Sequence, residues 1–194
     1  KIQKFVFSSS CTVYGQAEKL PIKEISPFKK PESPYGSTKQ IGEQIIKDLC
    51  NASSSFKTIA LRYFNPIGAH ESAKIGELPI GPPQNLVPCV TQTGIGIREK
   101  LSIFGNDYKT PDGTCIRDYV HVCDLVDAHI LGLKWLKDGK GSRIFNLGTG
   151  CGFSVREVIE QAKYITNKVV PIIEGERRAG DCTKLVSGSF RAAS

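Results

Sequence analysis

The segment KFVFSSSCTVYG at residues 4–15, taken with SPYGSTK at residues 33–39, decides how the rest of the chain is interpreted. The run Phe5-Val6-Phe7 is apolar and rich in β-forming residues, which predicts a buried strand over Ile2 to Ser8. Pro34 disfavours helical backbone just ahead of Tyr35, so a helix is predicted to begin there and to run to Cys50. Its apolar residues recur at helical spacing, at Ile41, Ile45, Ile46 and Leu49.

The next apolar run, Thr58 to Phe64, predicts a second strand that ends at Asn65-Pro66. A strand, a crossover helix and a strand in this order imply a parallel pair, and therefore an α/β fold. Residues 68–84 are rich in Gly, Pro and charge, which indicates a long loop, and such loops are commonly functional.

Three later helices are expected: one from near Leu86, one over Val122 to Leu136, and one that is opened by the capping pair Ser154 and Glu157 and ends near Ile165. Three later strands are expected over Leu101 to Phe104, Arg143 to Leu147 and Val169 to Ile173. The glycines Gly148, Gly150 and Gly152 do not have the G-x-G-x-x-G spacing. We interpret them as a turn between elements and not as a phosphate-binding loop.

Tyr35 and Lys39 are four residues apart and therefore neighbours on one face of the predicted helix. A Lys ammonium beside a phenol favours the phenolate. Bringing a Tyr pKa from about 10 to about 7 takes about 4 kcal/mol, which one cation seldom supplies, so a second cation such as an oxidised nicotinamide ring is indicated. Ser10 follows a strand at the carboxyl edge, where open parallel sheets bind ligands. The alternative for Y-x-x-x-K alone is an ordinary amphipathic surface helix.

Composition excludes several classes of protein. The net charge is +7, but the lysines are scattered and no nucleic-acid-binding motif occurs, so no nucleic-acid partner is expected. No apolar run reaches 18 residues, so no membrane span is expected. The seven cysteines are irregularly spaced without C-x-x-C, which predicts no metal site, no disulfide framework and a cytoplasmic location. The chain begins at Lys1 and lacks Met, which suggests a cut, processed or omitted amino terminus.

On these motifs the chain resembles the UDP-glucose 4-epimerases of the extended short-chain dehydrogenase/reductase family. Further matching stretches fall in the family's order and cover nearly the whole chain: LRYFNPIGAH at 61–70, IFGNDY at 103–108, DGTCIRDYVHV at 112–122, NLGTG at 146–150 and RRAGD at 177–181.

The resemblance implies the C-terminal part of a Rossmann-type doubly wound parallel sheet plus a smaller α/β substrate-binding domain. Residues 1–65 would form the catalytic end of the NAD-binding domain, and residues 66–194 mainly the UDP-sugar-binding domain, with about 114–147 returning to the first. By the family pattern, the half that carries the Gly-rich turn and the ribose acid is expected to be missing upstream.

The resemblance also implies the roles of individual residues. Tyr35 would be the base that removes the sugar 4-hydroxyl proton, Lys39 would bind the nicotinamide ribose and tune Tyr35, and Ser10 would bond the sugar oxygen. Cofactor contacts would come from Ser10, Tyr35, Lys39, Tyr63 and Phe64. Substrate contacts would come from Asn65, Asn85, Leu86, Ser102, Ile103, Phe104, Arg117, Arg178, Asp181 and Leu185.

Among these residues, Arg117 and Arg178 match the family's two diphosphate-binding arginines. The alternatives are a surface ion pair, for example between Arg117 and Asp118, and core packing for Phe104. Leu185 matches the position facing the sugar 2-substituent, where a fairly large residue implies a preference for unacetylated sugars.

The activity implied is an NAD-dependent interconversion of UDP-glucose and UDP-galactose by transient oxidation at sugar carbon 4, in a protein that is a homodimer when complete. The 194-residue chain by itself is expected to be inactive. Cys11 and Thr12 stand where related 4,6-dehydratases carry an Asp-Glu pair, which makes dehydration an unlikely reaction. Two alternatives stay open: a 4-epimerase of UDP-N-acetylhexosamines or UDP-pentoses, and an inactive sugar-nucleotide-binding fragment.

Overall fold

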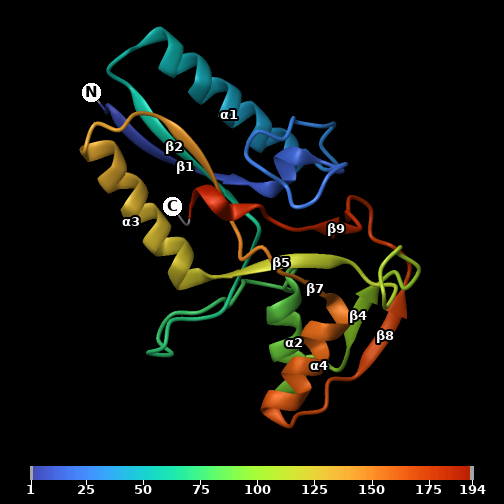
Figure 1. Ribbon diagram of the computed structural model, residues 1–194. Helices are drawn as coiled ribbons and strands as arrows, with labels where there is room; N and C mark the ends of the chain where they lie inside the picture. The colour runs from blue at the N-terminus through green and yellow to red at the C-terminus, as the bar shows by residue number, and fades with distance from the viewer. Residues whose placement is uncertain (1, 193–194) are drawn as a thin grey trace.

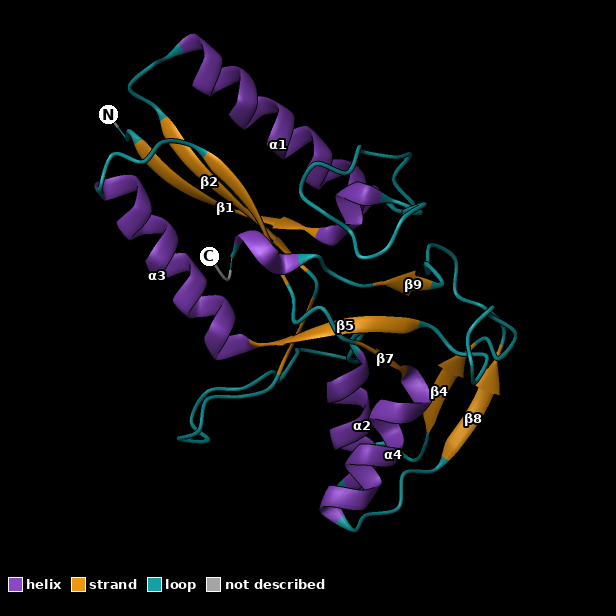
Figure 2. Ribbon diagram, in the orientation of Figure 1, coloured by secondary structure: helices purple, strands orange, loops and turns teal. Residues whose placement is uncertain are grey.

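The computed structural model describes residues 2–192. A three-stranded parallel sheet in the order β1-β2-β6 is formed by β1 (Lys4–Ser10), β2 (Lys57–Tyr63) and β6 (Arg143–Leu147). This sheet lies between helix α1 (Pro34–Ala52) and helix α3 (Val122–Lys137) (Figures 1 and 2). The α/β class expected from the sequence is confirmed, including its parallel pairing.

Strand β1 includes all three serines, whereas the sequence predicted an end at Ser8. Its ladder with β2 continues through Ser9 opposite Arg62 to Ser10 opposite Tyr63. The buried Ser9 hydroxyl has a partner, because it donates to Glu43 of α1. A short 3-10 helix, η1 (Cys11–Tyr14), then begins under the Ser10 side chain, which caps it.

Helix α1 begins at Pro34, one residue earlier than predicted. Proline is favoured at the first helical position because its missing N–H would lack a partner there. The preceding Ser33 caps the helix by accepting a hydrogen bond from the Gly36 N–H at 3.2 Å. The helix packs closely on β1 at Gly42, where an added Cβ would lie 2.6 Å from Cζ of Phe7.

A second sheet is organised around β5 (Ile116–His121), which pairs with β3 (Asn65–Ile67), β7 (Gly152–Ser154) and β9 (Lys184–Leu185). The strand predicted to end at Asn65-Pro66 does end just before these residues, but the sequence did not predict that they begin a strand of another sheet. Strand β2 ends at Tyr63, and after Phe64 the chain enters a different sheet, with Asn65 opposite Tyr119. Pro66 is tolerated there because β3 lies at the edge of this sheet.

A third unit packs α2 (Leu86–Gly94) and α4 (Val155–Thr166) against the parallel pair β4 (Leu101–Phe104) and β8 (Ile172–Gly175). The capping box of Ser154 and Glu157 is present as predicted. Strand β8 begins three residues later than the predicted Val169. The core of the unit is formed by Val90, Leu101, Ile103, Ile159 and Val170.

The turn after β6 wraps around the carboxylate of Asp118 in β5. Asp118 is fully buried and accepts from the backbone N–H groups of Thr149, Gly150 and Ser187 at 2.7–2.9 Å. An added Cβ at Gly148 would lie 2.7 Å from this carboxylate, so glycine is required. The N–H groups of this turn therefore bind an acid of their own chain, which agrees with the interpretation of the glycines as a turn.

The segment after β9 joins the two larger sheets. Ile22 donates its N–H to the Val186 carbonyl at 2.9 Å, and its own carbonyl accepts from Gly188 at 2.7 Å. A last 3-10 helix, η2 (Ser189–Arg191), follows. Residues 68–84 form a long loop, as predicted, and it projects from the molecule (Figure 1).

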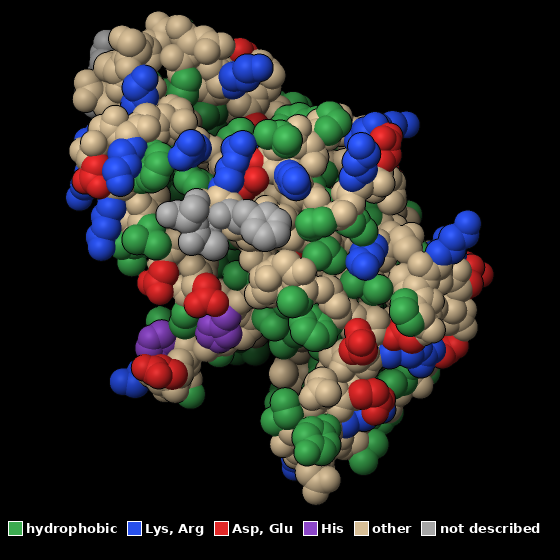
Figure 3. Space-filling model, in the orientation of Figure 1, with side chains coloured by type: hydrophobic (Ala, Val, Ile, Leu, Met, Phe, Trp, Pro, Cys, Tyr) green, Lys and Arg blue, Asp and Glu red, His purple; other side chains and the backbone are tan. Residues whose placement is uncertain are grey.

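The surface of the described residues has a mixed charge distribution. Lys and Arg side chains are scattered over the face shown in Figure 3, with acidic residues between them. Within residues 2–192, no helix is both long and apolar enough to cross a bilayer.

Candidate functional site

The first group of candidate residues lies where β1 ends and α1 begins. Ser10 is almost buried, and its Oγ accepts from the Thr12 N–H at 3.2 Å. Tyr35, in the first turn of α1, keeps 52% of its surface exposed. One turn later, the Lys39 ammonium lies 5.3 Å from the centre of the Tyr35 ring and donates to the Ser8 carbonyl at 2.8 Å.

This geometry determines what Lys39 can do. Its hydrogen bond to β1 fixes the ammonium beside Tyr35, where it attracts negative charge that develops on the phenol. An ammonium has three N–H donors, and the bond to Ser8 uses one of them. The remaining donors can serve a polar ligand that binds over the end of β1.

Tyr63 is the last residue of β2, and its side chain contacts β1 and helix α3. Its hydroxyl lies 2.8 Å from Ser8 Oγ and 2.6 Å from Nε2 of His129. The His129 Nδ1 lies 2.8 Å from the Leu125 carbonyl, which can only accept, so Nδ1 carries a proton. Burial raises the pKa of Tyr63 above its ordinary value, so this residue is a neutral hydrogen-bonding group at the base of the site.

Phe64 has a different position from the other predicted cofactor residues. Its ring is buried in a core cluster with Cys11, Val13 and Leu185. Its backbone N–H donates to the Leu147 carbonyl at 2.9 Å. The side chain therefore contributes to packing, and contact with a bound molecule would have to come from the remaining backbone.

A cleft between β5 and the unit of α2 and β4 contains the second group. Most of the predicted substrate residues line it, namely Asn65, Asn85, Leu86, Ser102, Phe104, Arg117, Arg178 and Asp181. Two do not. Ile103 is buried in the core behind β4, and Leu185 is buried in the cluster that contains Phe64.

Asp181 holds the two arginines of the cleft. Arg178 donates to both of its carboxylate oxygens, at 2.9 and 3.2 Å, and these bonds raise the pKa of Arg178 above its usual value. Arg117 lies 3.5 Å from the same carboxylate and donates to the Cys182 carbonyl at 2.6 Å. Both cations therefore face one opening, an arrangement suited to a ligand with more than one negative charge.

These contacts exclude the Arg117–Asp118 pair and core packing for Phe104, although both arginines form an ion pair with Asp181. The Asp118 carboxylate is occupied by N–H groups of Thr149, Gly150 and Ser187, so it is not the partner of Arg117. Phe104 is not a core residue, because its side chain is nearly half exposed and lies 5.8 Å from the Arg178 guanidinium.

Sequence reasoning missed other residues that line the cleft. Tyr119 stands two residues after Arg117 on β5, and Cys115 stands two residues before it, just ahead of the strand, so alternation turns all three toward the same face. That period of two was available in the sequence. Cys89 on α2 also lines the cleft. Among residues 2–192, no group of three or more His, Cys, Asp or Glu side chains is placed to hold a metal ion.

The chain is similar to proteins of known family and structure. Residues 1–148 match the model of the NAD dependent epimerase/dehydratase family. The chain is 48% identical to mouse UDP-glucose 4-epimerase over 180 residues, which are 93% of this chain and 52% of the mouse protein. The chain thus spans about half the length of the curated relatives it matches.

Two solved structures superpose closely on the chain. The UDP-glucose 4-epimerase from Stenotrophomonas maltophila, with bound NAD and formylated UDP-arabinopyranose, has a TM-score of 0.94 and 43% identity over 98% of this chain and 56% of its own. The enzyme from Bifidobacterium longum, in complex with NAD+ and UDP, has a TM-score of 0.92 and 41% identity over the same shares.

Proposed function

The chain belongs to the NAD dependent epimerase/dehydratase family, and from that premise we propose that the protein interconverts UDP-glucose and UDP-galactose through transient oxidation at sugar carbon 4. The observation that carries the proposal is the joint presence of two sites. Tyr35 and Lys39 stand together against β1, the strand that ends at Ser10, and a cleft with Arg117 and Arg178 lies on the neighbouring sheet.

We further propose a division of labour along the chain. Residues 1–65, with about 114–147, belong to the cofactor-binding unit, and most of residues 66–194 belong to the substrate-binding unit. The sheet β1-β2-β6 comes from the first set and the helices α2 and α4 from the second, in support of this division.

The residues present fit NAD as the cofactor. Lys39 has N–H donors left for the hydroxyls of a ribose, and Tyr63 offers a neutral hydroxyl below it. NAD, when bound there, would supply the hydride acceptor for oxidation at sugar carbon 4. Tyr35 takes the proton of the 4-hydroxyl group and gives it back, while Ser10 donates a hydrogen bond to the same oxygen. The Lys39 ammonium, 5.3 Å from the centre of the ring, attracts negative charge that develops on the phenol oxygen.

The cleft would hold the nucleotide half of the substrate. Arg117 and Arg178 would bind the diphosphate, because guanidinium groups match its oxygens in pairs. Asn85, Leu86, Ser102 and Phe104 surround the same opening and would contact the uridine. Asp181, which already orients both arginines, would face the ribose.

The environment of Cys11 argues against a dehydratase. Its thiol is buried, and burial raises its pKa to about 12. At neutral pH it stays protonated and cannot act as a base. The position that would carry an acid–base residue for loss of water therefore holds a thiol that cannot accept a proton.

We also propose that the complete protein pairs with a second copy of itself along α1. Ile41, Ile45 and Leu49 form an apolar stripe on this helix, and each is about half exposed. Sedimentation analysis of the protein and of an Ile45→Glu variant tests this. A dimer that this charge dissociates supports the proposal, and a wild-type monomer contradicts it.

The catalytic assignment is tested by turnover of UDP-galactose in the complete protein that contains this chain, supplied with NAD. Tyr35→Phe should fold and lose most activity, whereas Tyr164→Phe, a change at an exposed tyrosine on α4, should not. Lys39→Met should lower the rate, because the phenol loses the cation that stands beside it. Tight UDP binding without turnover under any NAD supply would instead indicate a binding module.

A further inference from the structure

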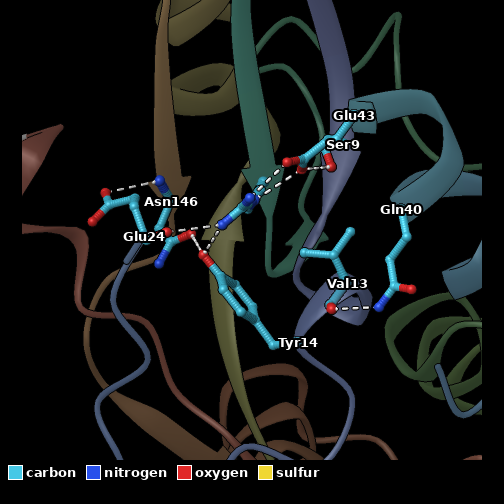
Figure 4. A network of polar contacts seen from close by, with 8 residues as sticks. Ser9, Val13, Tyr14, Glu24, Gln40, Glu43 and Asn146 are labelled. Atoms are coloured by element: carbon cyan, nitrogen blue, oxygen red, sulfur yellow. Dashed lines mark hydrogen bonds and ion pairs between the residues drawn. The ribbon is translucent and has the colours of Figure 1, made fainter. Parts of the chain in front are cut away.

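A buried network of polar side chains lies behind the candidate catalytic residues, and Figure 4 shows it from close by. Its centre is Glu43 of α1, whose side chain is 5% exposed. The Arg62 guanidinium of β2 binds both carboxylate oxygens, with Nε at 2.8 Å and Nη2 at 2.6 Å. The Ser9 hydroxyl of β1 donates to the same carboxylate at 2.5 Å. One side chain thus joins a helix to two strands.

Arg62 is held from its other side as well. Its Nη1 donates to the Tyr14 hydroxyl at 2.7 Å and to the Glu24 carbonyl at 3.1 Å. Tyr14 in turn donates to Asn146 of β6 at 2.6 Å. Burial acts to lower the pKa of Arg62, but the hydrogen bonds and charge interactions with Glu43 and Tyr14 together outweigh it, and the pKa is raised above its ordinary value. The guanidinium is therefore a fixed point in the sheet.

Stability alone does not explain such an ion pair. Removing two charges from water consumes most of the free energy that their attraction returns, and well-packed apolar residues often serve as well. What a two-pronged pair adds is geometry. The planar guanidinium accepts a carboxylate in one orientation, so it restricts both rotation and sliding of the element that carries the acid.

The position of Glu43 in the sequence shows which residues this ion pair holds in place. Glu43 is one turn beyond Lys39 and two turns beyond Tyr35 on α1, and Ser9 directly precedes Ser10 on β1. We propose that Glu43 is a positioning residue, which through Arg62 and Ser9 sets the register of α1 against β1 and so fixes Tyr35 and Lys39 relative to Ser10. This inference rests on the function proposed above for these three residues.

The first test compares two variants that weaken the same network on different sides. Glu43→Gln keeps the shape of the side chain but breaks the two-pronged pair. Tyr14→Phe removes a buried hydroxyl bonded to Arg62 and Asn146, while the contacts of Glu43 stay intact. Urea unfolding measures the stability lost by each, and steady-state kinetics with UDP-galactose measures kcat and KM.

We expect Glu43→Gln to lower kcat by about 10- to 100-fold, as a misplacement of about 1 Å can, with KM changed less than about twofold. Tyr14→Phe should lose stability but keep kcat within about twofold. Equal kcat losses in the two variants would show that the network only stabilises the fold, and would overturn the proposal.

Arg62→Lys separates the effect of geometry from the effect of charge. It keeps the positive charge but loses the planar guanidinium that binds both carboxylate oxygens of Glu43. It should reproduce the kcat defect of Glu43→Gln, and a wild-type kcat would refute the geometric argument. If Glu43→Gln does not fold, Ser9→Ala can be used instead. It removes the hydrogen bond from β1 to the Glu43 carboxylate and should also lower kcat. Unchanged kcat in a folded Ser9→Ala variant would then count against the proposal.

A readout without turnover distinguishes failure of this inference from failure of the proposed function. Amide hydrogen exchange of residues 36–40 reports how firmly the first turns of α1 are held. Glu43→Gln should speed this exchange more than Tyr14→Phe does at matched global stability. Should the wild-type protein lack epimerase activity, this comparison still decides whether Glu43 fixes the helix, and equal exchange in both variants overturns it.

Discussion

Replacing Asp118 by Asn should destabilise the protein strongly, and the contacts of Asp118 allow the magnitude to be worked out. Its Oδ1 accepts from Thr149 N and Oγ1 at 2.7 and 2.8 Å, and its Oδ2 accepts from Gly150 N and Ser187 N, both at 2.9 Å. Asn can present one oxygen to Thr149. Its NH2 group then faces the other two N–H donors, and no acceptor is left for them.

Two hydrogen bonds to a charged group are lost in a fully buried site. At about 1.5–3 kcal/mol each, the loss is about 3–6 kcal/mol, a large part of the roughly 5–15 kcal/mol that stabilises a typical domain. With a slope of about 2 kcal/mol per molar urea, the unfolding midpoint should fall by about 1.5–3 M.

Urea unfolding followed by far-UV circular dichroism measures this shift, and the slope should stay unchanged. Asp127→Asn, at an exposed position on α3, is the control and should stay within about 0.5 kcal/mol of wild type. If Asp118→Asn loses less than about 1 kcal/mol, the carboxylate does not hold the turn and the segment after β9 together as argued.

Three further outcomes are expected. Arg178→Ala should weaken UDP binding by about 1.5–3 kcal/mol, roughly 10- to 150-fold, whereas Arg177→Ala should not; calorimetry that finds both equal to wild type would remove Arg178 from the site. The wild-type protein should turn over UDP-glucose faster than UDP-N-acetylglucosamine, and equal rates would contradict that preference. Burial acts to raise the pKa of Asp112, but hydrogen bonds from Ser154 and Thr114 lower it below its ordinary value. Because the folded pKa is depressed, the stability Asp112 contributes is present above its unfolded pKa of about 3.9 and is lost as pH falls through the folded value. Unfolding midpoints measured from pH 5 to pH 2 should therefore fall less in Asp112→Asn than in wild type.

Local patterns in the sequence predicted what depends on neighbours along the chain. The spacing of Tyr35 and Lys39, the capping pair at Ser154 and the strand before the serines all involve residues within a few positions of one another. The structure agrees with each of them. The pairing of Asp181 with Arg178, three residues apart, has the same local character.

Contacts between distant elements escaped sequence reasoning. Glu43 and Arg62 lie on different elements, nineteen residues apart, and each one alone has the pattern of a solvated surface charge. The move of Asn65 into another sheet is decided by β5, which comes some fifty residues later and offers an open edge. Neither outcome follows from propensity, because each depends on which surfaces meet when the chain closes.

The joining segment after β9 has a consequence for biosynthesis. Ser187, which completes the shell of Asp118, lies 69 residues beyond it, and Leu185 covers the cluster around Val13. At about 5–20 residues per second, a ribosome that has added Asp118 needs about 3–14 s more to add Ser187. Until then the nascent chain carries an incompletely bonded buried acid and an uncovered apolar surface. We expect chains arrested before Leu185 to be cut readily by proteases and those extended past Gly188 to resist, so the pace of translation over this stretch becomes part of how the protein reaches its native state.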